Sequence, residues 1–243
     1  MSWNWILTKL KNNKRKTIED NVKEYYGMIA TRETSCCSTQ CSTAEISEDP
    51  AVFSLGCGIG GVEDAKPGDS VLDIGSGTGY EVFKVAQLVG DDGRVIGVDM
   101  TEKMLLRAQE NATRLGINNV TFKLGNAYEL PVENNSIDLV ISNCVINLTL
   151  DKELTFREIY RVLKPNGRIS VQDVVSEGEL PESLKNDMDL WNSCIAGAIP
   201  LNKYVEAIKA SGLIDVYAED VEIMENPDIK LLSARFKALK PSV

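Results

Sequence analysis

The chain has 243 residues, contains no histidine and carries a formal net charge of −10. An acidic surface disfavours nucleic acid as a substrate, because phosphate contacts need basic groups. The lack of histidine excludes Ser-His-Asp triads, Cys-His pairs and His-ligated zinc. A chain of this length can form one main α/β domain with an appendage.

The first residues combine a short apolar run with a cluster of basic residues. The run Trp3–Leu7 is too short to cross a bilayer, and the charges follow it, unlike those of a signal peptide. The segment could be a basic amphipathic helix on a membrane or subunit, or a solvated helix packed loosely on the main domain. No later run reaches a spanning length, so we expect a cytoplasmic protein without an integral membrane segment.

Residues 17–30 are predicted to form a helix, because apolar side chains recur there at helical spacing: Ile18, Val22, Tyr25, Tyr26 and Ile29. The stretch 31–50 is polar, rich in Ser and Thr, and contains three of the six cysteines. Loops of this length are usually functional or disordered. We treat residues 1–50 as an N-terminal helical and Cys-rich segment.

A glycine-rich turn interrupts the apolar run that begins at residue 70. The turn contains Asp73, Gly75, Gly77 and Gly79, and Asp99 follows twenty positions later at the end of another apolar run. Such a turn exposes backbone at a helix N-terminus, and the later acid is placed to accept hydrogen bonds from ribose hydroxyls. The pattern predicts a nucleoside site, although a glycine turn can also simply link a strand to a helix.

From residue 69 onward, strand and helix patterns alternate. Strands are expected at 70–74, 94–99, 119–124, 137–143 and 167–174, and helices at about 79–89, 101–115 and 151–163. This alternation predicts a Rossmann-like, doubly wound, mostly parallel sheet with helices on both faces, in a domain over 51–175. A helical stretch around 181–199, a helix near 201–211 and two strand-like runs form a small C-terminal cap and the end of the sheet over 176–243.

Ligands of such sheets bind at the carboxyl ends of the strands. The residues expected to surround one crevice there are Asp73, Gly75, Gly77, Gly79, Asp99, Met100, Asn126, Ala127 and Asn143. Tyr26 could close over a bound cofactor or belong to the core.

The six cysteines are Cys36, Cys37, Cys41, Cys57, Cys144 and Cys194. Thiols in a cytosolic protein are normally reduced, and clusters of them bind metals or take part in chemistry more often than they form disulfides. Cys57 lies among glycines that offer little apolar packing. Cys144 follows a strand end beside the predicted cofactor, although it and Cys194 could each be a small buried hydrophobe.

Several segments together resemble the arsenite S-adenosylmethionine methyltransferase family, whose glycine motif is of the G-x-G-x-G type. The resemblance extends over residues 22–215, and its specific part is the pair of segments around Cys144 and Cys194. The matching segments are Tyr26–Gly27, Leu55–Gly58, Asp73–Gly77, Gly97–Thr101, Ser142–Leu148, Phe156–Pro165 and Cys194–Ala198.

The resemblance implies S-adenosylmethionine as cofactor and a trivalent arsenical as substrate, in arsenic detoxification. It implies that thiolates of Cys57, Cys144 and Cys194 hold the arsenic, a soft centre that prefers sulfur ligands. Cys37 matches a family cysteine that relays the metalloid, with Cys36 and Cys41 as possible substitutes. Turnover would then need a thiol reductant such as a small thiol or thioredoxin.

Two other functions are compatible with the same residues. A methyltransferase of quinones or other organic small molecules would use the same fold, and its cysteines would be incidental. A thiolate metal-binding protein could hold zinc through Cys37, Cys41 and Cys57, although Cys37 and Cys41 are separated by three residues and no paired C-x-x-C motif is present.

Overall fold

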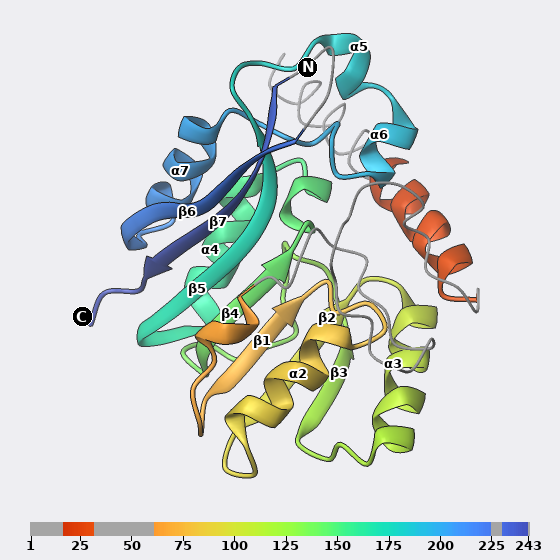
Figure 1. The fold of residues 1–243 in the computed structure, drawn as a ribbon, viewed down its shortest axis with the longest axis vertical. Coiled ribbons are helices and arrows are strands. Elements are labelled where there is room, and N and C mark those ends of the chain that lie inside the picture. The colour runs from red at the N-terminus through yellow and green to blue at the C-terminus, as the bar shows by residue number, and fades with distance from the viewer. Residues whose placement is uncertain (1–16, 32–60, 225–229, 243) are drawn as a thin grey trace, which may run out of the picture.

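The computed structural model describes residues 17–31, 61–224 and 230–242 (Figure 1). The basic N-terminal segment, the Ser/Thr-rich stretch and four of the six cysteines, Cys36, Cys37, Cys41 and Cys57, lie outside the described residues.

Seven strands form one sheet in the order β3-β2-β1-β4-β5-β7-β6. The first five strands pair in parallel, and β7 is antiparallel to both β5 and β6. The predicted Rossmann-like, mostly parallel fold is therefore confirmed. The strands are β1 (Ser70–Ile74), β2 (Arg94–Asp99), β3 (Val120–Leu124), β4 (Ile137–Asn143), β5 (Leu163–Ser176), β6 (Ile214–Met224) and β7 (Leu231–Leu239).

The helices lie where the periodicity predicts them, apart from the C-terminal region described below. Two short 3₁₀ turns, η1 (Val62–Asp64) and η2 (Ile146–Leu148), accompany the helices. The helices are α2 (Tyr80–Val89), α3 (Glu102–Leu115), α4 (Lys152–Val162), α5 (Glu182–Lys185), α6 (Met188–Asn192) and α7 (Leu201–Ala210).

Helices cover both faces of the sheet because successive strand residues point to opposite sides. In β1, Val71 packs into the cluster that contains the apolar face of α2, whereas Leu72 packs into the cluster that contains α4 and α7. All five β1 residues are buried. A central parallel strand covered in this way is rigid, so the residues that follow its carboxyl end have a well-defined position.

An N-terminal helix over residues 17–29 lies apart from the sheet and is drawn in red in Figure 1. The aliphatic members of its predicted stripe are buried: Ile18 and Val22 pack with Trp191, and Ile29 packs with Met104 of α3. Tyr25 and Tyr26 are partly buried. The helix therefore connects α3 to the segment after β5.

The region 181–199 differs from the single helical stretch that we predicted. It forms two short helices, α5 and α6, followed by a turn that contains Cys194. Asp187 begins α6, since its side chain accepts hydrogen bonds from the backbone N–H groups of Asp189 and Leu190. Cys194 has a φ of 60°, which a right-handed helix cannot continue through.

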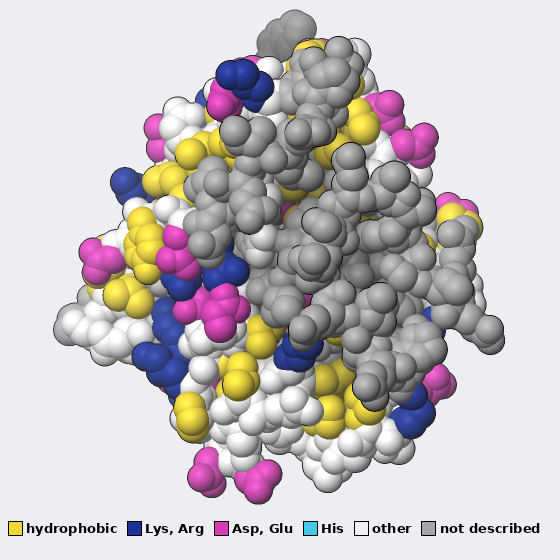
Figure 2. Space-filling model, viewed as in Figure 1, with side chains coloured by type: hydrophobic (Ala, Val, Ile, Leu, Met, Phe, Trp, Pro, Cys, Tyr) yellow, Lys and Arg dark blue, Asp and Glu magenta, His cyan; other side chains and the backbone are white. Residues whose placement is uncertain are grey.

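The surface drawn in Figure 2 shows Lys and Arg side chains interspersed with Asp and Glu side chains. Two ion pairs connect β7 to the segment before β1: Lys237 with Asp64 at 2.9 Å, and Arg235 with Glu63. None of the helices in the described part of the chain combines the length and apolar character that a membrane span requires.

One carboxyl group is buried in the core. Asp173 of β5 is fully buried and accepts hydrogen bonds from the backbone N–H of Asn147 (3.0 Å) and the Tyr204 hydroxyl (2.9 Å). The Tyr204 ring stacks on Phe236 with centroids 4.3 Å apart, which fixes the hydroxyl. Burial raises the pKa of Asp173 to about 7, although Lys152 opposes the shift.

This raised pKa predicts a pH dependence of stability. Between about pH 4 and pH 7 the folded chain keeps the Asp173 proton and the unfolded chain does not, so stability falls as pH rises. The free energy of unfolding of the wild type minus that of Asp173→Asn should fall by up to about 1.4 kcal/mol per pH unit from about pH 5 to pH 7. Urea titrations at several pH values measure this difference, and a difference that rises with pH would contradict the assignment.

Candidate active site

A cleft opens at the carboxyl ends of β1, β2 and β4, beneath the helix over residues 17–29. The cleft has a volume of about 1080 Å³ when its open mouth is included, which is enough for a nucleoside-sized ligand. Of the residues predicted from the sequence, those that line the cleft are Tyr26, Asp73, Gly75, Gly77, Asp99, Met100, Asn126, Ala127, Asn143, Cys144 and Cys194.

The loop after β1 presents its backbone to this cleft. Gly75 has a φ of 81°, and a Cβ there would lie 2.2 Å from Val145 Cγ2, so a larger residue would collide with the segment after β4. Gly77 also has a positive φ, and a Cβ there would meet nothing within 4 Å. The two glycines thus have different functions: Gly75 permits close packing, and Gly77 leaves the backbone open to a ligand.

Gly79, which the sequence also predicts at the cofactor site, is not among the residues that line the cleft. It is the N-cap residue of α2 and has a φ of 93°. A Cβ there would lie 2.5 Å from the Phe83 ring, on the side of the apolar core. Its function in this structure is to begin α2.

Asp99 at the end of β2 is held by backbone groups of two segments. One carboxylate oxygen accepts a hydrogen bond from the N–H of Gly77 (3.0 Å), and the other accepts one from the N–H of Thr101 (2.8 Å). A carboxylate oxygen can accept more than one hydrogen bond, so both atoms retain acceptor capacity. Asp99 therefore couples the glycine loop to α3 and can still bind ligand hydroxyls.

The carboxyl groups of Asp73, Glu81 and Asp99 interact with one another at the glycine-loop side of the cleft. Asp73 is 3% exposed, and one of its oxygens has no hydrogen-bond partner among the described residues. Burial raises the pKa of Asp73 well above its usual range, and the charges of Glu81 and Asp99 raise it further. A cationic ligand would relieve this repulsion.

Glu81 also lines the cleft, although it is not among the residues predicted from the sequence. It lies in the first turn of α2, is 8% exposed and accepts a hydrogen bond from the Asn143 side-chain amide at 3.2 Å. Its position two residues after Gly79 was a usable signal, since an acid at a helix N-terminus beside a glycine turn is often functional. Glu81 and Asn143 connect the first turn of α2 to the end of β4.

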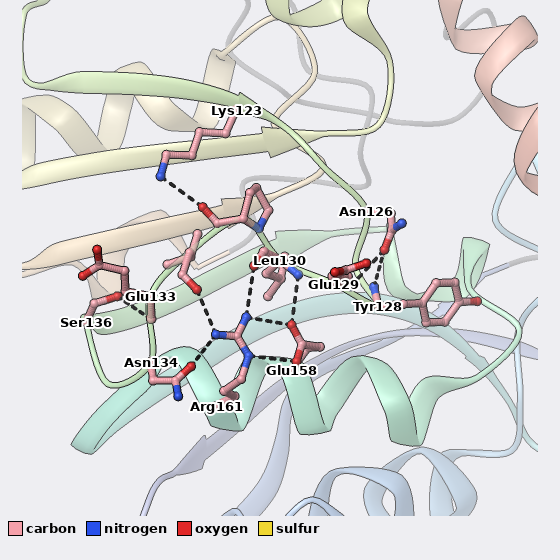
Figure 3. A network of polar contacts seen from close by, with 12 residues as sticks. Lys123, Asn126, Tyr128, Glu129, Leu130, Glu133, Asn134, Ser136, Glu158 and Arg161 are labelled. Carbon is pink, nitrogen blue, oxygen red and sulfur yellow. Dashed lines mark hydrogen bonds and ion pairs between the residues drawn. The ribbon is translucent and has the colours of Figure 1, made fainter.

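The loop after β3 closes another side of the cleft and is held by α4 (Figure 3). Asn126 Oδ1 accepts hydrogen bonds from the N–H groups of Tyr128 and Glu129, both at 2.9 Å, which folds the loop into a tight turn. The Tyr128 hydroxyl accepts a hydrogen bond from the N–H of Leu150 at 2.7 Å. These contacts bring Asn126, Ala127 and Tyr128 to the cleft.

Arg161 of α4 anchors the far half of that loop. It donates two hydrogen bonds to Glu158, both at 2.8 Å, and others to the carbonyl oxygens of Leu130 and Val132 (Figure 3). Glu158 in turn accepts a hydrogen bond from the N–H of Leu130. Arg161 lowers the pKa of Glu158, so the pair stays charged at neutral pH.

Cys144 and Cys194 both line the cleft and belong to one buried apolar cluster. Each is 6% exposed, and the Cys194 thiol donates a hydrogen bond to the backbone oxygen of Cys144 at 2.7 Å. The structure thus brings together two cysteines that are 50 positions apart in the chain. Within the described residues, no three Cys, Asp or Glu side chains are grouped so as to hold a metal ion.

The backbone at both cysteines is strained. Besides glycines, five described residues have a positive φ: Asn135, Cys144, Asn166, Cys194 and Asp215. Asn and Asp tolerate this conformation, whereas for cysteine it is uncommon. Such strain costs on the order of 1–3 kcal/mol per residue and concentrates at functional sites.

Tyr26 closes the cleft from the N-terminal helix. Its hydroxyl donates a hydrogen bond to the carbonyl oxygen of Asn192 at 3.1 Å, two residues before Cys194. Val22 and Tyr26 both line the cleft. The helix over 17–29 is thus connected to the cysteine-bearing turn and covers the space between the two halves of the site.

Comparison with known proteins agrees with this geometry. A family model described as "Methyltransferase domain" matches residues 65–226. The arsenite methyltransferase of Halobacterium salinarum is 36% identical over 89% of this chain, and that of Mus musculus is 32% identical over 92%. The chain belongs to the arsenite methyltransferase family. This confirms the predicted resemblance and the assignment to the S-adenosylmethionine-dependent methyltransferases.

A solved structure of this family has the same fold. The arsenic(III) S-adenosylmethionine methyltransferase of Chlamydomonas reinhardtii superposes with a TM-score of 0.71 and 32% identity, over 82% of this chain and 72% of that chain. This chain spans 61% of the length of the H. salinarum family member and 67% of that of the mouse protein.

The anchoring of the loop by Arg161 predicts a difference between two arginines of α4. Arg161→Ala should lower the free energy of unfolding by about 1 to 2 kcal/mol, because two loop carbonyls and Glu158 lose their donor. Arg157→Ala is the control, since Arg157 is exposed and makes one ion pair, with Glu153 at 3.7 Å. It should change stability by less than about 0.5 kcal/mol. Urea denaturation measures both, and equal effects would contradict the anchoring role.

Proposed function

We propose that this protein transfers the methyl group of S-adenosylmethionine to trivalent arsenic held by cysteine thiolates. The observation that carries the proposal is that one cleft has two unlike sides. One side has an exposed glycine backbone and three carboxyl groups, and the other has two cysteines in strained backbone. Membership of the arsenite methyltransferase family supports the same activity.

The acidic side of the cleft fits S-adenosylmethionine. Asp99 is placed to accept hydrogen bonds from the ribose hydroxyls, and the buried carboxyl groups of Asp73 and Glu81 match the positive charges of the ligand. The backbone of Gly75 and Gly77 allows close approach, and a further group lines the cleft beside them: Met100, Asn126, Ala127 and Asn143. When bound, the cofactor supplies an electrophilic methyl group on a sulfonium.

The cysteine side of the cleft suits a soft, trivalent centre. Arsenous acid exchanges its three hydroxyl groups for three thiols, and each departing hydroxyl takes the thiol proton and leaves as water. We assign Cys144 and Cys194 as two of the ligands and Cys57, which lies outside the described residues, as the third. The arsenic keeps its lone pair, which is the nucleophile.

The residues of the chain then contribute mainly by positioning. No proton has to be removed before attack, which fits a chain without histidine. Holding the arsenic and the methyl carbon in line is an entropic contribution that can be large. Exclusion of water by Tyr26 and its helix assists, since positive charge on sulfur diminishes during transfer.

Three further parts of the proposal concern the rest of the chain. We assign Cys37 to relay of the metalloid, with Cys36 and Cys41 as neighbours able to substitute, all outside the described residues. Methyl transfer uses the arsenic lone pair and leaves arsenic formally pentavalent; two cysteine thiols return it to the trivalent state by forming a disulfide, and a thiol reductant such as a small thiol or thioredoxin would reduce that disulfide between cycles. This chemistry requires reduced thiols and therefore a cytoplasmic location.

The cofactor side of the proposal is tested by Asp99→Ala. Loss of this carboxylate removes charge-assisted hydrogen bonds and should weaken S-adenosylmethionine binding by about 1.5 to 3 kcal/mol. Asp92→Ala is the matched control, because Asp92 is exposed in the turn after α2, outside the cleft. Calorimetry measures both affinities. An unchanged affinity in Asp99→Ala would place the cofactor elsewhere.

The thiol side is tested by Cys144→Ser and Cys194→Ser. Serine keeps the shape of the side chain but is a hard ligand, so arsenite methylation should be largely lost while S-adenosylmethionine affinity stays within about twofold. Arsenite methylation is measured with labelled cofactor and separation of the methylated arsenicals, and S-adenosylmethionine affinity is measured by calorimetry. Retention of most arsenite turnover in both variants would favour methylation of an organic substrate instead.

A further inference from the structure

The two cysteine-bearing turns need an interaction that keeps them in their strained conformation. A residue with a positive φ relaxes unless its surroundings restrain it. The Cys144 N–H donates to the carbonyl oxygen of Gln172 in β5 at 2.8 Å, so the first turn is held by the sheet. The second turn, around Cys194, lies outside the sheet and must be held by other contacts.

The side chain of Asn147 makes one such contact with the Cys194 turn. This side chain is fully buried, and its amide donates to the carbonyl oxygens of Cys194 (3.2 Å) and Val174 (2.5 Å). One amide group therefore connects the Cys194 turn to strand β5. Asn147 lies three residues after Cys144, so the same residue also belongs to the segment that carries the first cysteine.

Asn147 is itself restrained on two sides. Its backbone N–H donates a hydrogen bond to the Asp173 carboxyl group, which also accepts one from the Tyr204 hydroxyl. Its backbone oxygen lies so close to Gly197 that a Cβ there would be 1.7 Å away. Only glycine permits this approach, so the Cys194 turn lies directly against the Asn147 segment.

We propose that Asn147 is a positioning residue that holds the Cys144 and Cys194 turns together and so presents both thiols to trivalent arsenic. This inference rests on the proposed function, because it assumes that the two thiols bind arsenic. Asn147 does not line the cleft and acts through the backbone of Cys194.

The test compares Asn147→Ala with Asn119→Ala in the full chain under reducing conditions. Asn119 is a matched control, since its amide also donates to two backbone carbonyls, those of Ala86 and Gly90, both at 3.0 Å. Those carbonyls belong to the end of α2 and the residue after it, outside the cleft. The probe is phenylarsine oxide, which releases one water as it binds two thiols. For this measurement every chain compared, the reference included, also carries Cys36→Ser, Cys37→Ser, Cys41→Ser and Cys57→Ser, so that binding reports on Cys144 and Cys194.

Asn147→Ala should bind phenylarsine oxide at least about tenfold more weakly than the reference, with S-adenosylmethionine affinity unchanged within about twofold. Its KM for arsenite should rise more than its kcat falls. Asn119→Ala should leave both affinities unchanged. If Asn147→Ala does not fold, Asn147→Asp keeps the size of the side chain while removing both N–H donors, and the same selective loss is expected.

Other outcomes would overturn the inference. Unchanged arsenical binding in the Asn147 variant would show that the cysteine turns do not depend on this amide. An equal loss of arsenical and cofactor binding would indicate a general structural role. If the wild type itself fails to bind phenylarsine oxide or arsenite, the proposed function fails and this inference fails with it.

Discussion

The parallel pairing of β4 with β1 and β5 is the constraint on which the rest of the site depends. In a parallel sheet the carboxyl ends of neighbouring strands meet at one edge, and the loops that leave them converge. The glycine loop leaves β1, Asp99 ends β2, and Asn143 ends β4. Because these strands are buried on both faces, their ends are held by the whole core. The acids and the cysteines therefore share one cleft even though they come from distant parts of the chain.

The two sides of that cleft carry different energetic costs. On the acidic side, burial and the charges of Glu81 and Asp99 raise the pKa of Asp73, so the free protein contains repulsion that a cationic ligand can relieve. On the thiol side, the cost is conformational, since Cys144 and Cys194 both adopt a left-handed backbone. The core offsets both costs. Asp173 and Tyr204 are fully buried beneath the thiol side, and the Arg161–Glu158 pair fixes the loop that closes the acidic side.

Each part of this structure could be predicted from the sequence when the residues that determine it lie close together in the chain. The strands and the glycine loop were predictable, because local apolar spacing and glycine positions determine them. The path of residues 193–199 was not, since the turn at Cys194 depends on Asn147, 47 positions away. Glu81 and Asn147 were missed for a related reason: each is a polar residue in an apolar run, and its partner is known only once the chain is folded. Gly79 was assigned to the cofactor because its spacing matched, whereas its side of the loop faces Phe83.

The succession of Asn143 and Cys144 at the end of β4 has a further consequence. Asn143 contacts Glu81 on the acidic side, and Cys144 contacts Cys194 on the thiol side, so the last residue of β4 and the residue after it serve the two halves of the cleft. Their Cα atoms are separated by one peptide unit, about 3.8 Å. Covalent geometry therefore links the two half-sites at this point, and no hinge between domains can alter that spacing.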